Sequence, residues 1–514
     1  MYIQTSLIEK HFRETEALLR AVPKEDVANW LLKHGYFPES NVLPPSFNSE
    51  CLSLQQTPYH QDIQDISRRQ LSAISYPKSL LSSRTFAIQH PWNYHDVVFH
   101  LHENWGDVLD KLFAPGLRIY SYSMPIPVTK KAGIGLSKLR AGRMIYEWVR
   151  MAENDLVLDA TYFKYIAKTD ITNFYSSIYT HSIAWAMEGR ENAFSDKICA
   201  LVGNKVDKLI QYANEARTNG IPVGSALSDL VAEIVLSDID EKVSKNLAGT
   251  NFVAVRFKDD YRVLCESESD ATRILLELST ELSKFNLVLN ERKTSVSTLP
   301  DGLYRSHDRE YFPHSLRERK KITFKTFEHT LLIALDIHRK YPGTSIMEKF
   351  ISELLSSKNE LKLCFSHWPD RKVREIKKLF SLLFLVKRES EKLLSSVLSV
   401  VELTYLNNLE HKNKTKPYLR SIVETELKLA SEKESAFEIV WLIFFSRYIG
   451  LGITKFSEFI TKEQLLSNPY VKSIMSSQNK LYPDTGFSLF VKPSDCKGTP
   501  LVDQLDVFKR NVEA

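Results

Sequence analysis

The chain has 514 residues, enough for about two to four domains with a large hydrophobic core. Its formal net charge is only +5, so any surface for nucleic acid must be local rather than spread over the molecule. Five cysteines are scattered without a CxxC pair, which excludes a zinc ribbon or a disulfide framework and fits a reducing compartment. The N-terminus is amphipathic and charged, unlike a signal peptide, and the longest apolar run, 439–445, is too short for a bilayer. The sequence therefore predicts a cytosolic protein.

The first part of the chain, residues 1 to about 115, mixes helical patterns with loops rich in proline and aromatic residues. Apolar spacing predicts helices around 7–19 and 27–32, and nothing in this region indicates a chemistry. From Ile119 the alternation in RIYSYSMPIPV is typical of a strand, which Pro125 and Pro127 bring to an edge or an end. A basic segment follows, KKAGIGLSKLRAGR. Its cations, among them Lys138, Arg140 and Arg143, either hold a triphosphate on a glycine-flexed segment or form a solvated basic loop.

The next segment, YIAKTDITNFYSSIYTHSIAWAMEG, predicts a strand over 165–171 and a helix from around Ser176. Asp170, near the end of that strand, either caps the helix or is a metal ligand. Residues 200–213 are also expected to be helical. Gly220, Pro222 and Gly224 then precede an amphipathic helix from about 227 to 239. A glycine-rich turn before a helix is either a tight connection or a place where backbone approaches a nucleotide closely.

Residues 253–265, VAVRFKDDYRVLC, predict a β-hairpin with Asp259 and Asp260 at its tip. Adjacent carboxylates repel each other, and bound divalent cations would remove the repulsion. A solvated turn is the alternative, because aspartate is a favoured turn residue. We expect a helix over 271–285 and then a short strand in NLVLNERKTSV, which holds Asn290, Lys293 and Thr294.

Beyond Thr330 the pattern becomes helical. There is no glycine between Gly343 and Gly450, and apolar residues recur at i, i+3, i+4 and i+7. An all-helical domain is expected, solenoid-like in its succession of helices although no repeat of fixed period occurs. The basic runs 317–321 and 371–378 are either solvated helix faces or nucleic-acid surfaces.

The order of strand-Asp, Gly-Pro-Gly before a helix, FKDD hairpin and LN..KT resembles the palm of reverse transcriptases over roughly residues 115–300. The resemblance matches Asp170 to the first metal-binding aspartate and FKDD to the YxDD-type box. It also matches GIPVGSALS to the glycine-proline box and Lys293 to the lysine after the palm helix. It implies catalytic Asp170, Asp259 and Asp260; a metal site of Asp170, Ile171, Asp259 and Asp260; nucleotide contacts from Tyr175, Gly224, Lys293, Lys138, Arg140 and Arg143; and a template-side motif of Pro222 and Val223.

Two Mg²⁺ ions, for which Mn²⁺ can substitute, suit such a carboxylate set. Asp170 and Asp259, from neighbouring strands, would bridge ions about 3.5–4 Å apart that activate a primer hydroxyl and neutralise the leaving pyrophosphate. Asp260 would be a ligand or a support behind the ligands. Tyr175 is either the aromatic that this family places against the sugar, which favours deoxynucleotides, or a core tyrosine beneath the palm.

Two features depart from the family's pattern. Val223 stands where the glycine-proline box normally carries glutamine, and valine has no side-chain donor or acceptor for a template. No RNase H, integrase, zinc-endonuclease or maturase-like pattern is present, and a long N-terminal extension and a helical C-terminal domain flank the palm instead. That layout, with RFKDDY, resembles the abortive-infection (Abi) reverse transcriptases of bacteria, the AbiK-like and prophage-borne group.

The Abi resemblance implies an α+β polymerase right hand, with fingers and palm of reverse-transcriptase type, followed by an all-α HEAT-like C-terminal domain. The expected domains are 1–115 (N-terminal extension and part of the fingers), 116–310 (fingers and palm) and 311–514 (helical). It further implies phage defence in the bacterial cytoplasm, homo-oligomers (a trimer, or a hexamer), and untemplated DNA synthesis from dNTPs, primed by an unidentified protein hydroxyl. The product would be single-stranded DNA, covalently attached where synthesis is protein-primed. The alternatives are a template-directed reverse transcriptase and a non-catalytic binding scaffold.

Overall fold

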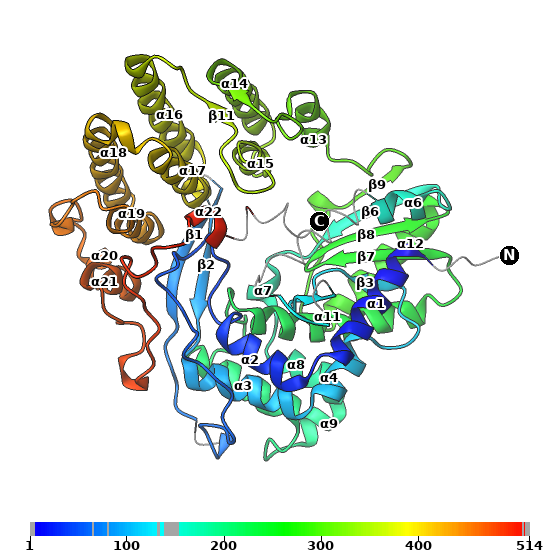
Figure 1. The fold of residues 1–514 in the computed structure, drawn as a ribbon. Coiled ribbons are helices and arrows are strands. Elements are labelled where there is room, and N and C mark those ends of the chain that lie inside the picture. Colours follow the sequence, from blue (N-terminus) through cyan, green and yellow to red (C-terminus); the bar gives the residue numbers. More distant parts are fainter. Residues whose placement is uncertain are drawn as a thin grey trace. The chain divides into compact units, whose positions relative to one another are not determined.

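The structure, a computed structural model, describes residues 6–63, 66–79, 82–130, 134–137, 154–505 and 508. The chain divides into two compact units (Figure 1). Unit 1 consists of residues 1–37, 50–72 and 87–304, and unit 2 of residues 38–49, 73–86 and 305–514. Two N-terminal pieces thus belong with the C-terminal part of the chain, which the three consecutive ranges expected from sequence did not foresee.

Unit 1 is built on a five-stranded sheet in the order β3–β7–β8–β6–β9 (Figure 1). The strands are β3 (Ile119–Ser121), β6 (Tyr165–Asp170), β7 (Phe252–Phe257), β8 (Asp260–Cys265) and β9 (Ser295–Thr298). β3 runs parallel to β7, and the other neighbours are antiparallel. The predicted hairpin is therefore confirmed as β7–β8 at the centre of the sheet, with the predicted strand β6 beside it.

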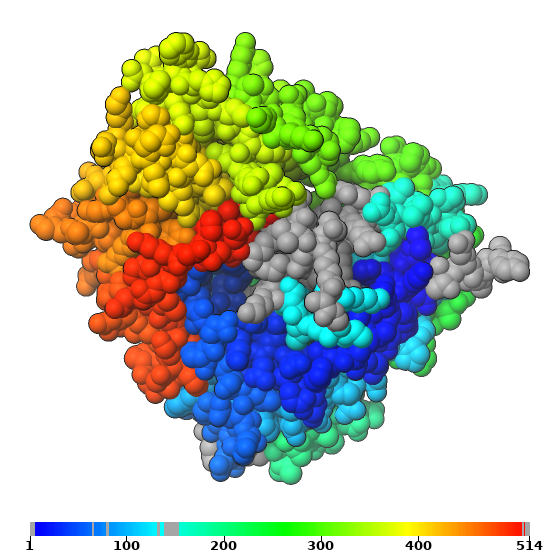
Figure 2. Space-filling model, viewed as in Figure 1, coloured from blue at the N-terminus to red at the C-terminus, as the bar shows by residue number. Residues whose placement is uncertain are grey.

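Unit 1 also contains eleven described helices. They are α1 (Leu7–Ala21), α2 (Lys24–Lys33), α3 (Pro91–Glu103), α4 (Trp105–Leu112), α6 (Leu156–Ala160), α7 (Phe174–Ser177), α8 (His181–Glu188), α9 (Arg190–Ser195), α10 (Val202–Ala213), α11 (Ala226–Asn246) and α12 (Glu268–Ser283). Of these, α1, α11 and α12 contact this sheet. Two further strands of two residues each, β4 (Val128–Thr129) and β5 (Gly135–Leu136), pair antiparallel with each other. The exposed sides of α1 and α2 form part of the surface seen in Figure 2.

Helix α11 is the central helix of unit 1, and the expectation of an amphipathic helix there is wrong. Most of its residues from Ala226 to Asp240 are buried. It packs against α4, α8, α12 and β3, which leave it almost no solvent-facing side. Its polar residues are therefore buried as well, and each requires a partner.

Two further local expectations need correction. The helix expected from around Ser176 is divided into α7 and α8, because the chain between them pairs with the glycine-proline loop through the bridge Tyr179–Asn219. The strand expected across NLVLNERKTSV is confined to β9, and residues 291–293 form a 3₁₀ turn, η3. Lys293 therefore stands on a turn.

Unit 2 is mainly helical. Its helices are α13 (Ser306–Tyr311), α14 (Phe324–Lys340), α15 (Ile346–Glu353), α16 (Pro369–Glu389), α17 (Leu394–Leu406), α18 (Lys412–Glu432), α19 (Ala436–Tyr448), α20 (Glu463–Ser467), α21 (Pro469–Ser476) and α22 (Leu501–Gln504). Helices α16 to α19 pack as neighbours (Figure 1). In the residues that the structure describes, no helix is long and apolar enough to cross a bilayer.

The expectation of an all-helical C-terminal domain is wrong in one respect, because unit 2 also contains strands. Strands β10 (Ile322–Thr323) and β11 (Leu363–Cys364) form a short parallel pair. Most of the hairpin β1 (Ser72–Ser79) with β2 (Ser82–Ile88) also falls in this unit. Direct contacts hold residues 38–49 in this unit. The Trp441 indole donates a hydrogen bond to the Val42 carbonyl at 3.2 Å, and Phe47 forms an isolated antiparallel β-bridge with Phe490.

Glu402 on α17 makes unit 2 sensitive to pH. Its side chain is 1% exposed and accepts a hydrogen bond from the Leu501 amide at 2.8 Å. Burial raises the pKa of Glu402 from 4.5 to about 7 despite that bond. The folded state therefore retains a proton that the unfolded chain loses above about pH 4.5, so this contribution to stability falls as the pH rises toward 7.

Glu402→Gln keeps a carbonyl acceptor for Leu501. We expect this variant to reduce the difference in unfolding free energy between acidic and neutral pH by about 1–3 kcal/mol. Thermal unfolding at about pH 5 and about pH 8 measures it, and the two melting temperatures should approach each other in the variant. The control is Glu432→Gln, at an exposed position of α18. Equal pH dependence in Glu402→Gln and wild type would contradict the assignment.

Candidate active site

The three predicted catalytic aspartates come together where β6 meets the β7–β8 hairpin. Asp170, the last residue of β6, is the cross-strand partner of Asp260, the first residue of β8. The turn itself is Lys258–Asp259, with Lys258 at φ 52°. The Ile171 amide donates to the Asp259 carbonyl at 3.0 Å, which holds the hairpin tip against the end of β6. The expected convergence of two strand ends and one turn is therefore present in the backbone.

Strand alternation separates the aspartates from the buried side of the sheet. Arg256 and Tyr261 are cross-strand partners, and both reach α11 residues. Asp260 directly precedes Tyr261, and successive side chains of a strand point to opposite faces. Asp260 and its partner Asp170 thus belong to the face that α11 does not cover.

A buried charge network lies between the hairpin and α11. The Arg256 guanidinium, 0% exposed, donates to both Glu233 oxygens at 3.0 and 3.1 Å and to Asp240 at 2.9 Å. Ser121 and Ser123, at the end of β3, donate to Glu233 at 2.7 and 2.6 Å. Burial raises the pKa of Asp240 to about 6, although the Arg256 charge opposes that change. The network is almost fully hydrogen-bonded, which is what makes buried charges tolerable.

Asp170 is the carboxylate best prepared for a ligand. Its side chain is 15% exposed, and its Oδ2 accepts a hydrogen bond from Lys293, whose side chain is 62% exposed. Its Oδ1 is buried and has no hydrogen-bond partner among the described residues. The Asn290 amide donates to the Asp170 carbonyl at 2.8 Å, so η3 is fixed against the end of β6.

The residues present fit a divalent cation such as Mg²⁺. Carboxylate oxygens are the protein ligands that Mg²⁺ prefers, and a bound cation would satisfy Asp170 Oδ1, which is buried without a hydrogen-bond partner among the described residues. Within the described ranges, no three His, Cys, Asp or Glu side chains are arranged as a ready-made metal cage. In this arrangement the Lys293 ammonium supplies the positive charge beside Asp170. A bound metal cation would take the place of that ammonium.

Tyr175 belongs to a second polar cluster that the sequence did not reveal. Its hydroxyl donates to Asp229 Oδ1 at 2.6 Å, and Lys258 Nζ donates to Asp229 Oδ2 at 3.2 Å. The Lys258 ammonium lies 6.0 Å from the centroid of the Tyr175 ring. Burial, and then Asp229, raise the pKa of Tyr175 well above its usual value, so the hydroxyl stays protonated and donates. Asp229 thereby connects the predicted sugar-side residue to the hairpin tip.

The glycine-proline loop runs along the segment that carries Tyr175. The Ile221 amide donates to the Tyr175 carbonyl at 3.0 Å, and the Gly220 amide to the Ile178 carbonyl at 2.9 Å. Gly220 has φ +83°, and a Cβ there would lie 3.2 Å from the Ser176 carbonyl oxygen, so only glycine fits.

Two further residues of the loop bear on the predicted template side. Pro222 and Gly224 are buried, whereas Val223 is partly exposed and its carbonyl accepts from the Ala87 amide at 2.8 Å. The loop is therefore fixed by backbone bonds, and position 223 offers only an apolar side chain.

The predicted triphosphate contacts are only partly visible. Lys293 lies at the aspartates, as described above. Lys138, Arg140 and Arg143 lie outside the described residues. The residues that sequence analysis missed are Asp229, Glu233, Asp240 and Arg256. Their only sequence signal is the spacing of acidic residues along the helix after the glycine-proline box.

Adjacent strand ends presenting aspartates, over a sheet backed by a buried helix, are the arrangement expected of a polymerase palm. Residues 128–337 match the model of the family "Reverse transcriptase (RNA-dependent DNA polymerase)". Over these residues the chain therefore matches a reverse transcriptase domain, and such a domain is of the nucleotidyltransferase class. The comparison with curated proteins gave no match.

Telomerases are among the solved structures similar to this chain. An apo telomerase from Candida tropicalis, truncated from its C-terminal domain, is 16% identical over 48% of this chain and 52% of its own, with a TM-score of 0.30. The chain thus spans about half the length of that protein. The apo telomerase from Candida tropicalis (12% identity, 71% of each chain) and a Candida albicans telomerase in complex with a TWJ fragment of telomeric RNA (12%, 70% and 65%) also score 0.30. Likeness at this level places no residue, so the site rests on the family match and the geometry.

Asp259→Asn should abolish nucleotide incorporation while leaving the fold intact, because a neutral amide cannot hold a cation that the carboxylate holds. Asp170→Ala should do the same. Incorporation of labelled dNTPs with Mg²⁺ measures the loss, and circular dichroism checks the fold. Asp107→Asn, an exposed aspartate on α4, is the matched control. Wild-type incorporation by either variant would remove the aspartates from the reaction.

Tyr175→Ala should admit ribonucleotides, because removing the ring opens space beside the sugar, whereas Tyr175→Phe should keep the discrimination. The Phe variant loses only the bond to Asp229. Competition between dGTP and rGTP distinguishes the two variants. If neither variant changes the ratio, Tyr175 has a purely structural role.

Proposed function

We propose that this protein is a DNA polymerase of phage defence that makes DNA from dNTPs without a template and starts on a hydroxyl of the protein itself. The observation that carries the untemplated part is Val223. In the loop expected to lie beside a template base, the side chain has no donor or acceptor, and the backbone carbonyl is already bonded to Ala87. A net charge of +5 also gives little general attraction for a long duplex.

The chain's own groups have separate parts in this proposal. Asp170, Asp259 and Asp260 hold the cations, with the Ile171 backbone beside them, and Tyr175 excludes the 2′-hydroxyl side of the sugar. Lys293 moves from Asp170 to the triphosphate, and Lys138, Arg140 and Arg143 add positive charge there. The chemistry that two bound Mg²⁺ ions supply is a lower pKa for the attacking hydroxyl and charge neutralisation on the leaving pyrophosphate.

The first step is a nucleotidyl transfer to protein. A Tyr or Ser hydroxyl oxygen attacks the α-phosphorus of a dNTP, its proton passes to solvent, and the bond between α-phosphorus and bridging oxygen breaks to release pyrophosphate. The new phosphodiester leaves a 3′-hydroxyl for the next dNTP. The product is single-stranded DNA that remains attached to the protein.

The wider biological setting follows from the Abi resemblance. We propose an abortive-infection role in the bacterial cytoplasm, an assembly of three or six copies, and a HEAT-like character for the helices of unit 2. A homo-oligomer that encloses the palm would leave room for one strand rather than a duplex.

A second candidate is template-directed synthesis by a retroelement or another defence system. The observation that favours it is the family description itself, an RNA-dependent DNA polymerase. The two candidates differ in whether the product sequence depends on added RNA.

Incubation of purified protein with dNTPs and Mg²⁺ alone should yield DNA that remains on the protein through boiling in SDS. Nuclease should restore the original gel mobility, and protease should leave DNA with a residual peptide that identifies the priming residue. Asp259→Asn, treated identically, is the control and should give no shift. Product that appears only with added RNA or DNA, and that copies it, would replace this proposal with the templated one.

A further inference from the structure

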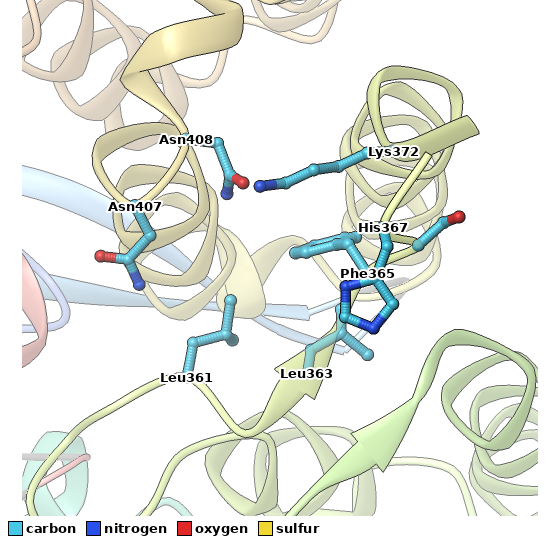
Figure 3. Close-up of a pocket in the computed structure, with 8 residues that line it drawn as sticks. Leu361, Leu363, Phe365, His367, Lys372, Asn407 and Asn408 are labelled. Atoms are coloured by element: carbon cyan, nitrogen blue, oxygen red, sulfur yellow. The ribbon is translucent and has the colours of Figure 1, made fainter. Parts of the chain in front are cut away.

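A cavity of about 340 Å³ opens within unit 2, far along the chain from the reverse transcriptase aspartates. It lies between the segment that leads into α16 and the C-terminal end of α17 (Figure 3). Phe365, His367 and Lys372 line one side, and Asn407 and Asn408 the other. Its volume is within the range of small-ligand sites, and an aromatic, an imidazole, an ammonium and two amides face it.

Several polar side chains that line this cavity are available to form hydrogen bonds with a ligand. The side chains of Asn407 and His367 have no hydrogen-bond partner within the part of the chain that the structure describes. Asn408 uses its amide nitrogen on the Thr404 carbonyl at 2.7 Å, which leaves its oxygen as an acceptor. Together these side chains offer donors and acceptors of the kind that read the edge of a nucleobase.

The wall of the cavity is a fixed structure. Glu375 on α16 accepts the Ser366 amide at 2.7 Å and Arg371 Nε at 3.1 Å, which pins the 365–367 segment to the helix. Lys372 Nζ bonds to Glu410 at 2.9 Å, beside the start of α18.

Aromatic faces accompany the polar groups. Phe365 is partly exposed at the cavity, and Trp368, two residues before α16 Asp370, is 75% exposed. Trp368 directly follows His367, which lines the cavity, so an exposed aromatic ring stands next to the cavity lining in the chain. Base–aromatic stacking tolerates any sequence, because every base has a π-face.

Positive charge extends outward from the cavity along two helices. Residues 370–378 carry five Lys or Arg and two Asp or Glu, and residues 410–416 carry three Lys and one Glu. The ion pairs Lys372–Glu410 at 2.9 Å and Lys414–Asp370 at 3.0 Å show that these two segments lie side by side. The two basic segments therefore lie next to each other, and Lys372 belongs both to the first segment and to the cavity lining, although Arg371, Lys372, Lys378 and Lys414 are each held in an ion pair.

We propose that unit 2 carries a second nucleic-acid site, at which single-stranded DNA inserts one base into the cavity. The base stacks on Phe365 and bonds to Asn407 and His367, Trp368 stacks on a neighbouring base, and the phosphates follow the cations of α16 and α18. A duplex does not fit, because its bases are stacked on both faces and cannot enter a pocket of this size. Basic residues on two adjacent segments and an exposed aromatic ring beside the lining favour a strand over a free nucleotide. The site is separate from the proposed polymerisation and does not require it.

The test uses the full-length protein and an oligodeoxythymidylate that contains 5-iododeoxyuridine. Crosslinking by light, followed by peptide mapping, should place adducts within residues 361–372. Fluorescence anisotropy should show that Trp368→Leu weakens binding by roughly fivefold or more, since one base stack is lost. Lys372→Gln should reduce the slope of log Kd against log salt concentration by about 1, the value expected for one lost phosphate contact.

Matched controls come from the same unit. Phe312→Leu changes an aromatic that is 78% exposed and does not line the cavity, and Lys455→Gln changes an exposed lysine elsewhere. Both should bind as wild type does. Adducts confined to residues 154–304, or unchanged affinity in Trp368→Leu, would overturn the proposal, and so would displacement of the strand from 361–372 by dTTP at equal concentration.

Nucleotide incorporation, measured in parallel, separates this proposal from the proposed function. Trp368→Leu should still incorporate the first dNTP, because no residue of the palm is altered. If wild-type protein incorporates no nucleotide but still gives adducts at 361–372, the polymerase proposal is overturned and the strand site is supported.

Discussion

The buried ion pairs of Arg256 are the constraint on which unit 1 depends. Arg256 lies in the hairpin that carries Asp259 and Asp260, two of the predicted catalytic aspartates, while Glu233 and Asp240 lie on α11. Removing one partner would leave an unpaired charge in the core, which costs about 3–5 kcal/mol. The same Glu233 accepts hydrogen bonds from Ser121 and Ser123 at the end of β3. One guanidinium therefore fixes the hairpin, the central helix and the outer strand in a single register.

Helical spacing extends this constraint to the predicted sugar pocket. Asp229 stands one turn before Glu233 on α11, so the two carboxylates lie on the same side of the helix. Glu233 binds β7 through Arg256, two residues before Lys258 of the turn, and Asp229 binds the turn through Lys258 as well as the Tyr175 hydroxyl. Movement of the hairpin would therefore also disturb the residue predicted to exclude ribonucleotides. The predicted sugar-side residue and the hairpin turn therefore share Asp229 as a common support.

Sequence reasoning succeeded where the signal was local. Period-two alternation and adjacent aspartates predicted the β7–β8 hairpin, and Gly220 with Gly224 predicted a constrained loop before a helix. It failed where the answer depended on tertiary packing. Nothing in the local pattern shows that α11 is buried on all sides, that Asp229 bonds to Tyr175, or that residues 38–49 pack with unit 2. The 3₁₀ turn at Lys293 was missed because residues 291–293 contain no glycine or proline to mark a turn.

Charged side chains are buried on one face of the central sheet and partly exposed on the other. Behind the sheet, Arg256 is fully buried and its pairs cannot exchange without exposing the core. In front, Asp170 is paired with Lys293, whose side chain is 62% exposed, and an exposed pair of this kind is worth only about 0–1 kcal/mol. A cation that binds two carboxylates can displace that lysine at small cost, whereas breaking the pairs of Arg256 behind the sheet would cost about 3–5 kcal/mol. Fixed charge therefore holds the geometry, and exchangeable charge is reserved for the side on which a nucleotide and its metal ions would bind.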